Sequence, residues 1–467
     1  MKEKIFLNRY HHLKRWVPGL FRPCTYAILL KGGLLFTSLL TASLQVSAQD
    51  TASNKITSLP DVFKMAVANS VQLKIAAQNA DLARQVTSVR ELDKLPSVST
   101  KIDYGYISNA DIWTPSFSKH LVAPIPHQYT DFSVIAGEII FKGNLVNNNL
   151  RRSTIEEQIA QLNVDKNTTD IKFLVAAQYL DIYRLIDQRK VFSSNLKLAR
   201  YRLKNIQTMQ KQGMVTQNDV LRTTLTISDL QLAIRQIDDN IVIQNRHLNM
   251  VTGQPDTNSL APDTTLLEKK IDQQSMSYFI QSGYSGNHDL KIAGSQKKVA
   301  ELNVKIAGSD RYPELSLFTG TDLQRPYTYS DPKEDVFYNV WEAGISLKYN
   351  ISSIYQSPRK IKAAKIQLEE TSSAETLTRQ KMEVAISTAY IKYTEAQEDL
   401  RTYEHDLGAA EENYRIVEKK YFNQLALLTD ILDAATTKLE AELKVTNAKV
   451  NTIYTYYQLL QSTGNIN

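Results

Sequence analysis

The chain has 467 residues, and its 55 lysines and arginines against 49 aspartates and glutamates give a formal net charge of +6. The surplus lies in the first 48 residues, which hold seven basic residues and one acidic residue, so the remainder is near neutral and does not favour nucleic-acid binding. With Cys24 as the only cysteine, we expect no disulfide.

The first 48 residues have the pattern of a signal peptide. Six basic residues precede an apolar stretch from Tyr26 to Leu40 that Lys31 interrupts. Val46-Ser47-Ala48 has the small-residue spacing that signal peptidase reads, so we expect cleavage after Ala48. Cys24 precedes the apolar stretch and is badly placed for a lipid anchor. Because no later apolar run reaches about 18 residues, we expect no membrane-spanning helix in the mature chain.

The second half of the chain repeats the first. Leu73-Lys74-Ile75-Ala76 and Pro96 return, at one constant interval, as Leu290-Lys291-Ile292-Ala293 and Pro313. Another set keeps a second constant interval: Tyr179 with Tyr390, Asp219 with Asp430, Leu221 with Leu432, Leu248 with Leu459, and Thr252-Gly253 with Thr463-Gly464. Such a repeat predicts two copies of one structural unit. We expect a signal peptide at 1–48, a first repeat at 49–253, a linker at 254–274 and a second repeat at 275–467.

The first repeat is expected to begin with one helix, which opens near Leu59 and ends before Pro96, because proline cannot continue a helix. A strand over 97–106 and a second over 132–141 follow, separated by an exposed loop from Ile107 to Thr130. A helix over about 144–211 has no proline and would be roughly 100 Å long. After a tip, a returning helix shows heptad spacing at Leu230, Ile234, Ile237, Ile241, Gln244, Leu248 and Val251.

The second repeat is expected to follow the same order. Strands over 314–323 and 341–349 enclose an exposed loop over 325–337, and a long helix follows over about 358–421. Its returning helix has heptad spacing at Leu439, Leu443, Thr446, Val450, Ile453, Tyr457 and Leu460.

The strands alternate between an apolar and a polar face over about ten residues, which is typical of a membrane barrel. The clearest case is 97–106, whereas Glu138 interrupts the apolar face of 132–141. The alternative is a soluble hairpin half-buried on a core. Four strands cannot close a barrel and open edges are not tolerated in lipid, so a membrane-embedded sheet requires several chains, in a number that the sequence does not give.

The two tips carry a resemblance to a known family. The first reads Gln212-Gly213-Met214-Val215-Thr216-Gln217-Asn218-Asp219-Val220-Leu221, and the second reads Tyr421-Phe422-Asn423-Gln424-Leu425-Ala426-Leu427-Leu428-Thr429-Asp430-Ile431-Leu432-Asp433-Ala434. With the repeat and the paired strands, they make the mature chain resemble the TolC-type outer-membrane efflux channels. Tips of that family are similar to the first, and Asp430 and Asp433 resemble its aspartate pair at the periplasmic mouth. Gln424, in place of the glycine seen at Gly213, is a departure.

The resemblance implies an α+β membrane protein of the outer membrane with a periplasmic extension. A homotrimer would give each protomer's four strands to one 12-stranded transmembrane β-barrel in outer-membrane lipid, and its coiled-coil-like helices would form a periplasmic α-barrel tunnel. It further implies a passive exit duct for efflux or type I secretion, with an inner-membrane transporter and a periplasmic adaptor. Adaptor docking would use Gly213, Met214, Val215, Asp219, Gln424 and Leu425, with weaker or different docking at Gln424.

Asp430 and Asp433 have two interpretations. Three residues apart, they share one helical face and in a trimer would place six carboxylates at a constriction that favours cations. Alternatively, Asp430 caps the start of a helix and Asp433 is a solvated charge in its first turn. Spacing alone leaves both open.

Enzymatic signals are missing from the sequence. The mature histidines are scattered and no glycine-rich phosphate loop follows a strand, so we expect neither catalysis nor a cofactor or metal. The competing hypothesis is a soluble periplasmic coiled-coil scaffold or adaptor. The cargo, whether a drug, a metal ion or a protein, stays open.

Overall fold

The computed structural model describes residues 56–263, 274–330 and 332–466. The expected signal peptide and residues 264–273 of the expected linker lie outside the described residues. Within the described ranges, none of the helices is both long enough and apolar enough to cross a membrane.

Each repeat begins with a broken helix, where we predicted a continuous one. In the first repeat, α1 (Leu59–Asn69) ends and α2 (Val71–Leu92) begins at Ser70, whose extended backbone interrupts the helix and whose side chain accepts from the Leu73 N–H. In the second, α5 (Met276–Gly286) and α6 (His288–Ser309) meet at Asn287, whose side chain accepts from the Leu290 N–H. The repeated leucines therefore belong to the first turn of a capped helix. The prediction was wrong because serine and asparagine are also tolerated inside helices.

The returning helices end against these breaks. The end of α4 (Gln217–Thr252) is Gly253, and the end of α8 (Leu428–Thr463) is Gly464; their φ angles are +68° and +79°. The Asn69 amide donates to the Thr252 carbonyl (2.9 Å), and the Asn287 amide donates to the Ser462 carbonyl (3.0 Å). A Cβ at either glycine would lie under 3 Å from the opposing helix end, so both the conformation and the close approach require glycine.

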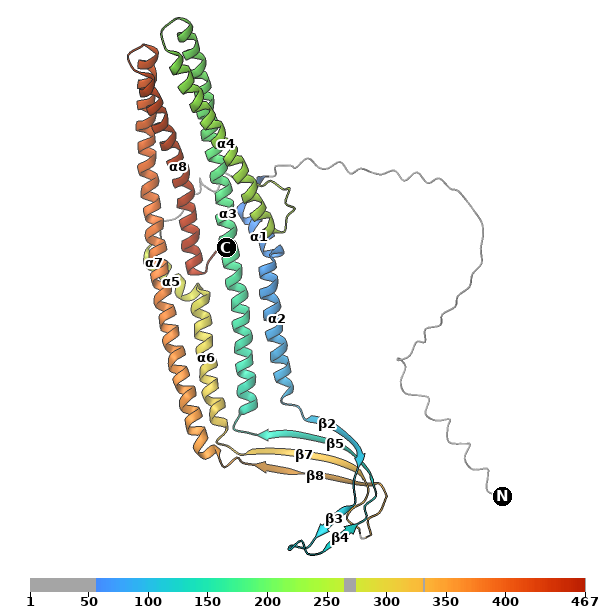
Figure 1. Cartoon of the computed structure of the whole chain (residues 1–467). Coiled ribbons are helices and arrows are strands. Elements are labelled where there is room, and N and C mark those ends of the chain that lie inside the picture. Colours follow the sequence, from blue (N-terminus) through green and yellow to red (C-terminus); the bar gives the residue numbers. More distant parts are fainter. Residues whose placement is uncertain (1–55, 264–273, 331, 467) are drawn as a thin grey trace, which may run out of the picture. The chain divides into compact units, whose positions relative to one another are not determined.

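The short helices consequently stack end to end along two long ones, α3 (Leu145–Lys211) and α7 (Ser353–Phe422), as Figure 1 shows. With 67 residues, α3 is roughly 100 Å long, as predicted. It packs on α2 and α4 of its own repeat and on α6 and α8 of the other, whereas α7 packs on α5, α6 and α8. The predicted heptad positions lie at these contacts, since Leu230, Leu248 and Ile453 are buried. The start of α7 at Ser353 precedes the predicted start at Pro358.

One antiparallel sheet joins the repeats, in the order β2 (Ser97–Tyr106), β5 (Gln128–Phe141), β7 (Glu314–Arg325), β8 (Tyr338–Lys348). Cross-strand partners confirm the alternation of faces. One row is Ile102, Phe132 and Leu323, and the adjacent row on the other face is Lys101, Ser133 and Asp322. The two faces of the sheet therefore differ in polarity along its length.

The described residues contain more strands than the four we predicted. A hairpin of β3 (Ala110–Trp113) and β4 (His120–Ala123) lies within the predicted 107–130 loop, and β5 begins inside that loop. Each strand of the hairpin has only four residues, and the apolar side chains Ile112, Leu121 and Val122 give no period-two pattern that stands out from a loop. Outside the sheet, β1 (Ile56–Thr57) pairs in parallel with β6 (Ala261–Pro262).

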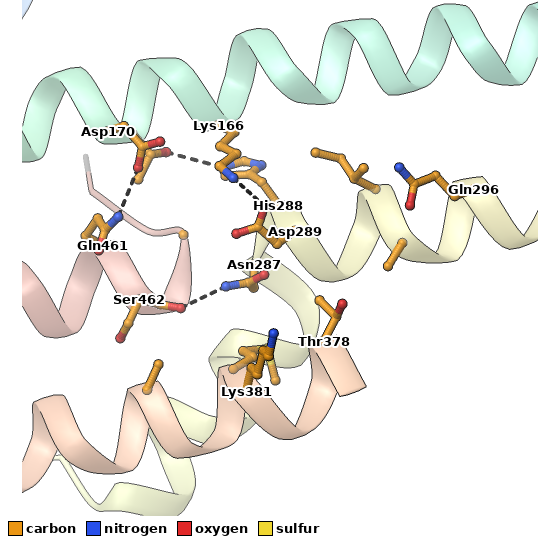
Figure 2. Close-up of a pocket in the computed structure, with 16 residues that line it drawn as sticks. Lys166, Asp170, Asn287, His288, Asp289, Gln296, Thr378, Lys381, Gln461 and Ser462 are labelled. Carbon is orange, nitrogen blue, oxygen red and sulfur yellow. Dashed lines mark hydrogen bonds and ion pairs between the residues drawn. The ribbon is translucent and has the colours of Figure 1, made fainter. Parts of the chain in front are cut away.

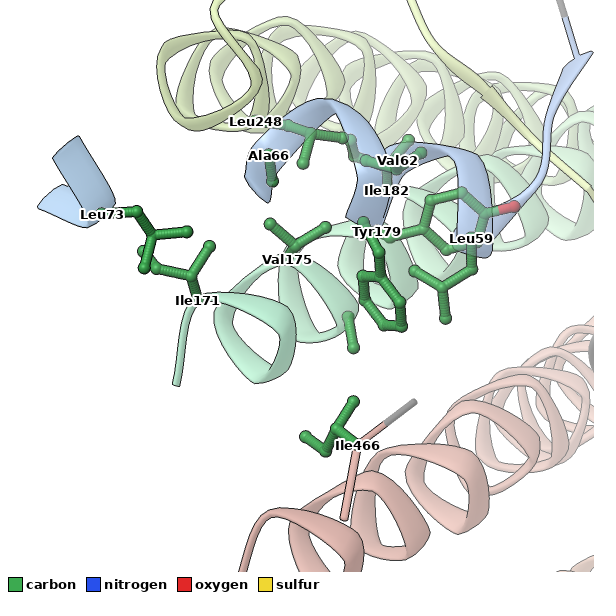
Figure 3. Close-up of a cluster of buried hydrophobic side chains, with 12 residues drawn as sticks. Leu59, Val62, Ala66, Leu73, Ile171, Val175, Tyr179, Ile182, Leu248 and Ile466 are labelled. Carbon is green, nitrogen blue, oxygen red and sulfur yellow. The ribbon is translucent and has the colours of Figure 1, made fainter. Parts of the chain in front are cut away.

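The largest buried cluster lies where α1 packs on α3 (Figure 3). Leu248 of α4 and Ile466, after α8, complete it. Tyr179 is 1% exposed, and its hydroxyl donates to the Thr57 carbonyl (3.0 Å) and accepts from the Asp263 N–H (2.6 Å). Burial raises the pKa of Tyr179 to about 12. One hydroxyl thus attaches both β1 and the chain after β6 to the long helix.

We predict that Tyr179→Phe lowers the free energy of unfolding by about 1–3 kcal/mol, because it removes two buried hydrogen bonds. Thermal unfolding followed by circular dichroism in detergent measures the loss. Tyr390→Phe is the matched control, since that repeat counterpart makes neither bond. Equal effects of the two substitutions would contradict this role for the Tyr179 hydroxyl.

Candidate functional site at the hairpin tips

The first tip is a tight turn between α3 and α4. Gly213 has a φ of +73°, and the N–H of Met214 donates to the Met209 carbonyl (2.9 Å). The N–H of Gly213 donates to the Gln210 carbonyl (2.9 Å). This pattern satisfies the last carbonyls of α3 and is the usual way a helix ends at glycine.

The second tip, between α7 and α8, has the same backbone without glycine. Gln424 has a φ of +60°, the Leu425 N–H donates to the Lys420 carbonyl (2.8 Å) and the Gln424 N–H donates to the Tyr421 carbonyl (2.9 Å). The departure noted in the sequence therefore changes the side chain at this position and leaves the turn intact.

An aspartate caps the helix after each turn. The Asp219 carboxylate accepts from the Thr216 N–H (2.9 Å), and the Asp430 carboxylate accepts from the Leu427 N–H (2.9 Å). At the first tip the Thr216 hydroxyl completes the reciprocal pair, which Leu427 cannot do because its side chain has no acceptor. The capping geometry considered for Asp430 is thus present. Asp433 lies one turn further on, and both carboxylates are exposed in the single chain.

Apolar packing holds the two tips together within one chain. Ile206 of α3, Tyr421 of α7, and Leu428 and Ile431 of α8 are buried in one cluster, and Val215 of the first turn packs against it. Met214 and Leu425 point away from this cluster, with exposed fractions of 46% and 75%. Of the predicted docking residues, Val215 is therefore partly used in packing, and Met214 and Leu425 present apolar surface at the tips.

A buried polar group lies just behind the tips. Arg202 is 4% exposed; it donates to the Tyr414 hydroxyl (3.0 Å), which donates to the Glu418 carboxylate (2.6 Å). Burial raises the pKa of Tyr414, and the hydrogen bond to Glu418 raises it further. Sequence reasoning missed Arg202, although Ala199, Arg202 and Ile206 follow the spacing of a buried helical stripe in which a basic residue is conspicuous.

A separate polar cavity of about 680 Å³ lies at the break between α5 and α6, against α3, α7 and the end of α8. Figure 2 shows Lys166 and Asp170 of α3 facing His288 and Asp289 of α6. Lys166 donates to the Asp289 carboxylate (2.5 Å), and Asp170 accepts from the Gln461 amide (2.9 Å). In the described part of the chain, no three His, Cys, Asp or Glu side chains are grouped to hold a metal ion.

His288 contacts α3 through its ring. Its Nε2 lies 3.2 Å from the Thr169 hydroxyl, which also lies 3.2 Å from the Asp165 carbonyl. Its Nδ1 is buried without a hydrogen-bond partner among the described residues. Burial lowers the pKa of His288, and Lys291 acts in the same direction.

Part of the chain matches a known protein family. Residues 280–465 match the outer membrane efflux protein family. The chain resembles the outer membrane efflux proteins. No curated protein matches it significantly in sequence.

Solved channel structures share the fold of this chain. The outer membrane protein VceC of Vibrio cholerae superposes with a TM-score of 0.72 at 14% identity, over 87% of this chain and 96% of that one. The CmeC outer membrane channel of Campylobacter jejuni gives 0.71 at 13% identity, over 94% and 95%. The open-state MtrE outer membrane channel of Neisseria gonorrhoeae gives 0.69 at 14% identity, over 87% and 89%. These likenesses show that the chain has the fold of the outer-membrane channels.

We predict that exchanging the two turn residues changes stability in opposite directions. Gln424→Gly raises the free energy of unfolding by about 0.5–1 kcal/mol, because it removes a side chain from a left-handed position, and Gly213→Gln lowers it by about 1 kcal/mol. Chemical denaturation measures both. Steric crowding does not explain the loss of stability in Gly213→Gln, since a Cβ at Gly213 would meet nothing within 4 Å. A loss of stability in Gln424→Gly would contradict the conclusion that the left-handed backbone at Gln424 is strained.

His288 predicts a pH dependence of stability. Its pKa is lowered in the folded chain, so the unfolded chain takes up the proton first, and the free energy of unfolding falls as the pH drops below the ordinary value of 6.5. We expect His288→Gln to flatten this fall in denaturation curves between pH 7 and pH 5. His405→Gln, at an exposed histidine of α7, is the control and should not change it.

Proposed function

We propose that three copies of this chain close into a single channel that crosses the outer membrane and continues through the periplasm. The proposal rests on surfaces that one chain leaves exposed. The internal repeat predicts which surface of a neighbouring copy covers each of them. Three such surfaces are the sheet edges, a stripe on α2 and a stripe on α7.

The sheet has two free edges. β2 and β8 each pair with one neighbour, so each leaves a row of backbone N–H and C=O groups unpaired within the sheet. A membrane does not tolerate such edges, because it supplies no water to satisfy them. Pairing β8 of one copy with β2 of the next removes both, and three copies give a closed barrel of twelve strands.

The apolar face of the sheet suits lipid. Ile102 of β2 and Leu347 of β8 are 70% and 69% exposed, and Trp341 on the same face is 71% exposed. The opposite face carries Lys101, Asp103 and Asp322. In the closed barrel the apolar face meets the membrane and the charged face lines the channel.

The repeat predicts how the helices join between copies. Within one chain α3 packs against α6, so the corresponding pair is α7 and α2, which do not pack together in the described part of one chain. Both helices have exposed apolar stripes on the side away from their core. They consist of Val71, Ile75, Leu82, Val86 and Val89 on α2, and of Leu377, Val384 and Ile391 on α7.

The residues at corresponding positions differ in chemistry. Lys166 and His288 line the polar cavity between α3 and α6, and their repeat counterparts are Leu377 and Val71, which are 50% and 69% exposed. The seam between copies is thus apolar where the seam within one chain is polar. Burying these side chains gives each new seam a hydrophobic driving force.

The tips then surround the periplasmic mouth. In a trimer, Asp430 and Asp433 supply six carboxylates that favour cations, while Asp430 also caps α8. Met214 and Leu425 offer apolar contacts, with Gly213, Val215, Asp219 and Gln424 around them, to a periplasmic adaptor that links the duct to an inner-membrane transporter. The two tips share one backbone turn, so both can dock in the same way.

We predict a trimeric mass in detergent and small, cation-selective currents in planar bilayers. Asp430→Ala/Asp433→Ala should raise the current or reduce the selectivity, because it removes charge from the mouth. Bilayer conductance and reversal potentials measure both.

Asp229→Ala/Asp239→Ala, which alters two aspartates on α4 away from the tip, is the matched control for charge. Unchanged currents in the mouth variant would leave capping as the role of Asp430. A monomer that stays soluble without detergent and gives no current would overturn the channel and favour a periplasmic scaffold.

A further inference from the structure

The first few turns of both long helices form a basic surface next to the sheet. The stretch from Ser353 to Leu368 of α7 contains four basic residues and no acidic one. The stretch from Leu145 to Ile155 of α3 contains two basic residues and no acidic one. Neither helix has an acidic residue in its first turn, which is also true of α2 and α5. The basic residues begin at the seventh position of each helix, beyond the first turn in which the helix dipole acts, so the dipole does not explain them.

Each long helix carries one basic pair at the same distance from its start. Arg151 and Arg152 are the seventh and eighth residues of α3, and Arg359 and Lys360 are the seventh and eighth of α7. The eighth residue is engaged in each case: Arg152 bonds to Asn303 and pairs with Glu156, and Lys360 pairs with Asp310. The seventh residue is exposed in each case and makes no ion pair in the described part of the chain.

Arg151 and Lys362 stay accessible when the neighbouring helices are in place. α3 already packs against both α2 and α6, and Arg151 is still exposed. By the repeat interval that pairs Lys166 with Leu377, Arg151 corresponds to Lys362, so Lys362 stays exposed when α7 gains its neighbour from the next copy. Because helical side chains tilt toward the N-terminus, the guanidinium groups of Arg151 and Arg359 lean toward the sheet.

The apolar residues beside them indicate what the surface meets. Ile351 and Tyr355, just before and at the start of α7, are 73% and 66% exposed, and Lys362 follows Tyr355 after two turns on the same side. Tyr312 and Tyr349, at the ends of the adjoining strands, are 54% and 42% exposed. Tyrosine beside basic side chains whose stems can lie along apolar surface is typical of a membrane interface.

We propose that Arg151, Arg359 and Lys362 bind the phosphate groups of anionic phospholipids in the periplasmic leaflet of the outer membrane. Guanidinium groups bind phosphate oxygens in bidentate fashion, and exposed tyrosines beside them hold the acyl and glycerol region. This surface, which we call the basic collar, fixes the depth of the barrel in the membrane. The inference rests on the proposed insertion of the sheet.

The test measures lipid retention by the full protein. The detergent-solubilised assembly is incubated with phosphatidylglycerol or phosphatidylcholine, and bound lipid is counted by native mass spectrometry. We expect a preference for phosphatidylglycerol that Arg151→Gln/Arg359→Gln weakens by about fivefold for each arginine removed and that salt reduces. Arg235→Gln/Arg246→Gln, two exposed arginines of α4 without ion pairs in the described residues, is the matched control and should keep the preference.

Other results would overturn the inference in distinguishable ways. An equal preference in the collar variant and the control, with bilayer currents intact, rejects the collar and leaves the channel. Complete displacement by inorganic phosphate assigns the arginines to free anions instead of lipid. Failure of the unaltered protein to enter vesicles of either lipid rejects the proposed insertion, and the collar with it.

Discussion

The backbone at the edges of the four-stranded sheet is the constraint on which the rest of the structure depends. β2 and β8 leave their outer N–H and C=O groups unpaired in the sheet, and only another strand satisfies them in a membrane. Each strand pair is joined to a long helix that begins within a few residues of its last strand, so closing the sheet also brings the helices into a ring. In the proposed trimer, the exposed apolar stripes on α2 and α7 lie where that closure requires contact.

The helices are organised by capped breaks and returns. Ser70 and Asn287 interrupt a helix at corresponding places, and Gly253 and Gly464 end the returning helices against them. The two repeats share this frame but fill it differently. An apolar cluster around Tyr179 stabilises the first break, whereas a polar cavity with His288 lies at the second. In the proposed trimer, these differences make the seam within one chain polar and the seam between copies apolar.

The tips hold exposed side chains on a stable turn. Asp219 and Asp430 cap helices, and Ile431 and Tyr421 pack the tips together, so the exposed residues are held on a fixed turn. Gln424 accepts a strained conformation there and keeps the turn of Gly213. A capping carboxylate remains charged and exposed, and for this reason capping and cation selection by Asp430 are compatible in the proposed trimer.

The sequence by itself predicted the long helices, the four sheet strands and the tips, because proline-free heptads and period-two alternation are local patterns. It did not predict the breaks at Ser70 and Asn287, the β3–β4 hairpin or buried Arg202, since each depends on contacts between distant segments. Asn287 breaks its helix where the end of α8 arrives, and Arg202 is buried because Tyr414 of the other repeat covers it. Tertiary structure decided these points, because burial and close approach belong to pairs of elements and no single element encodes them.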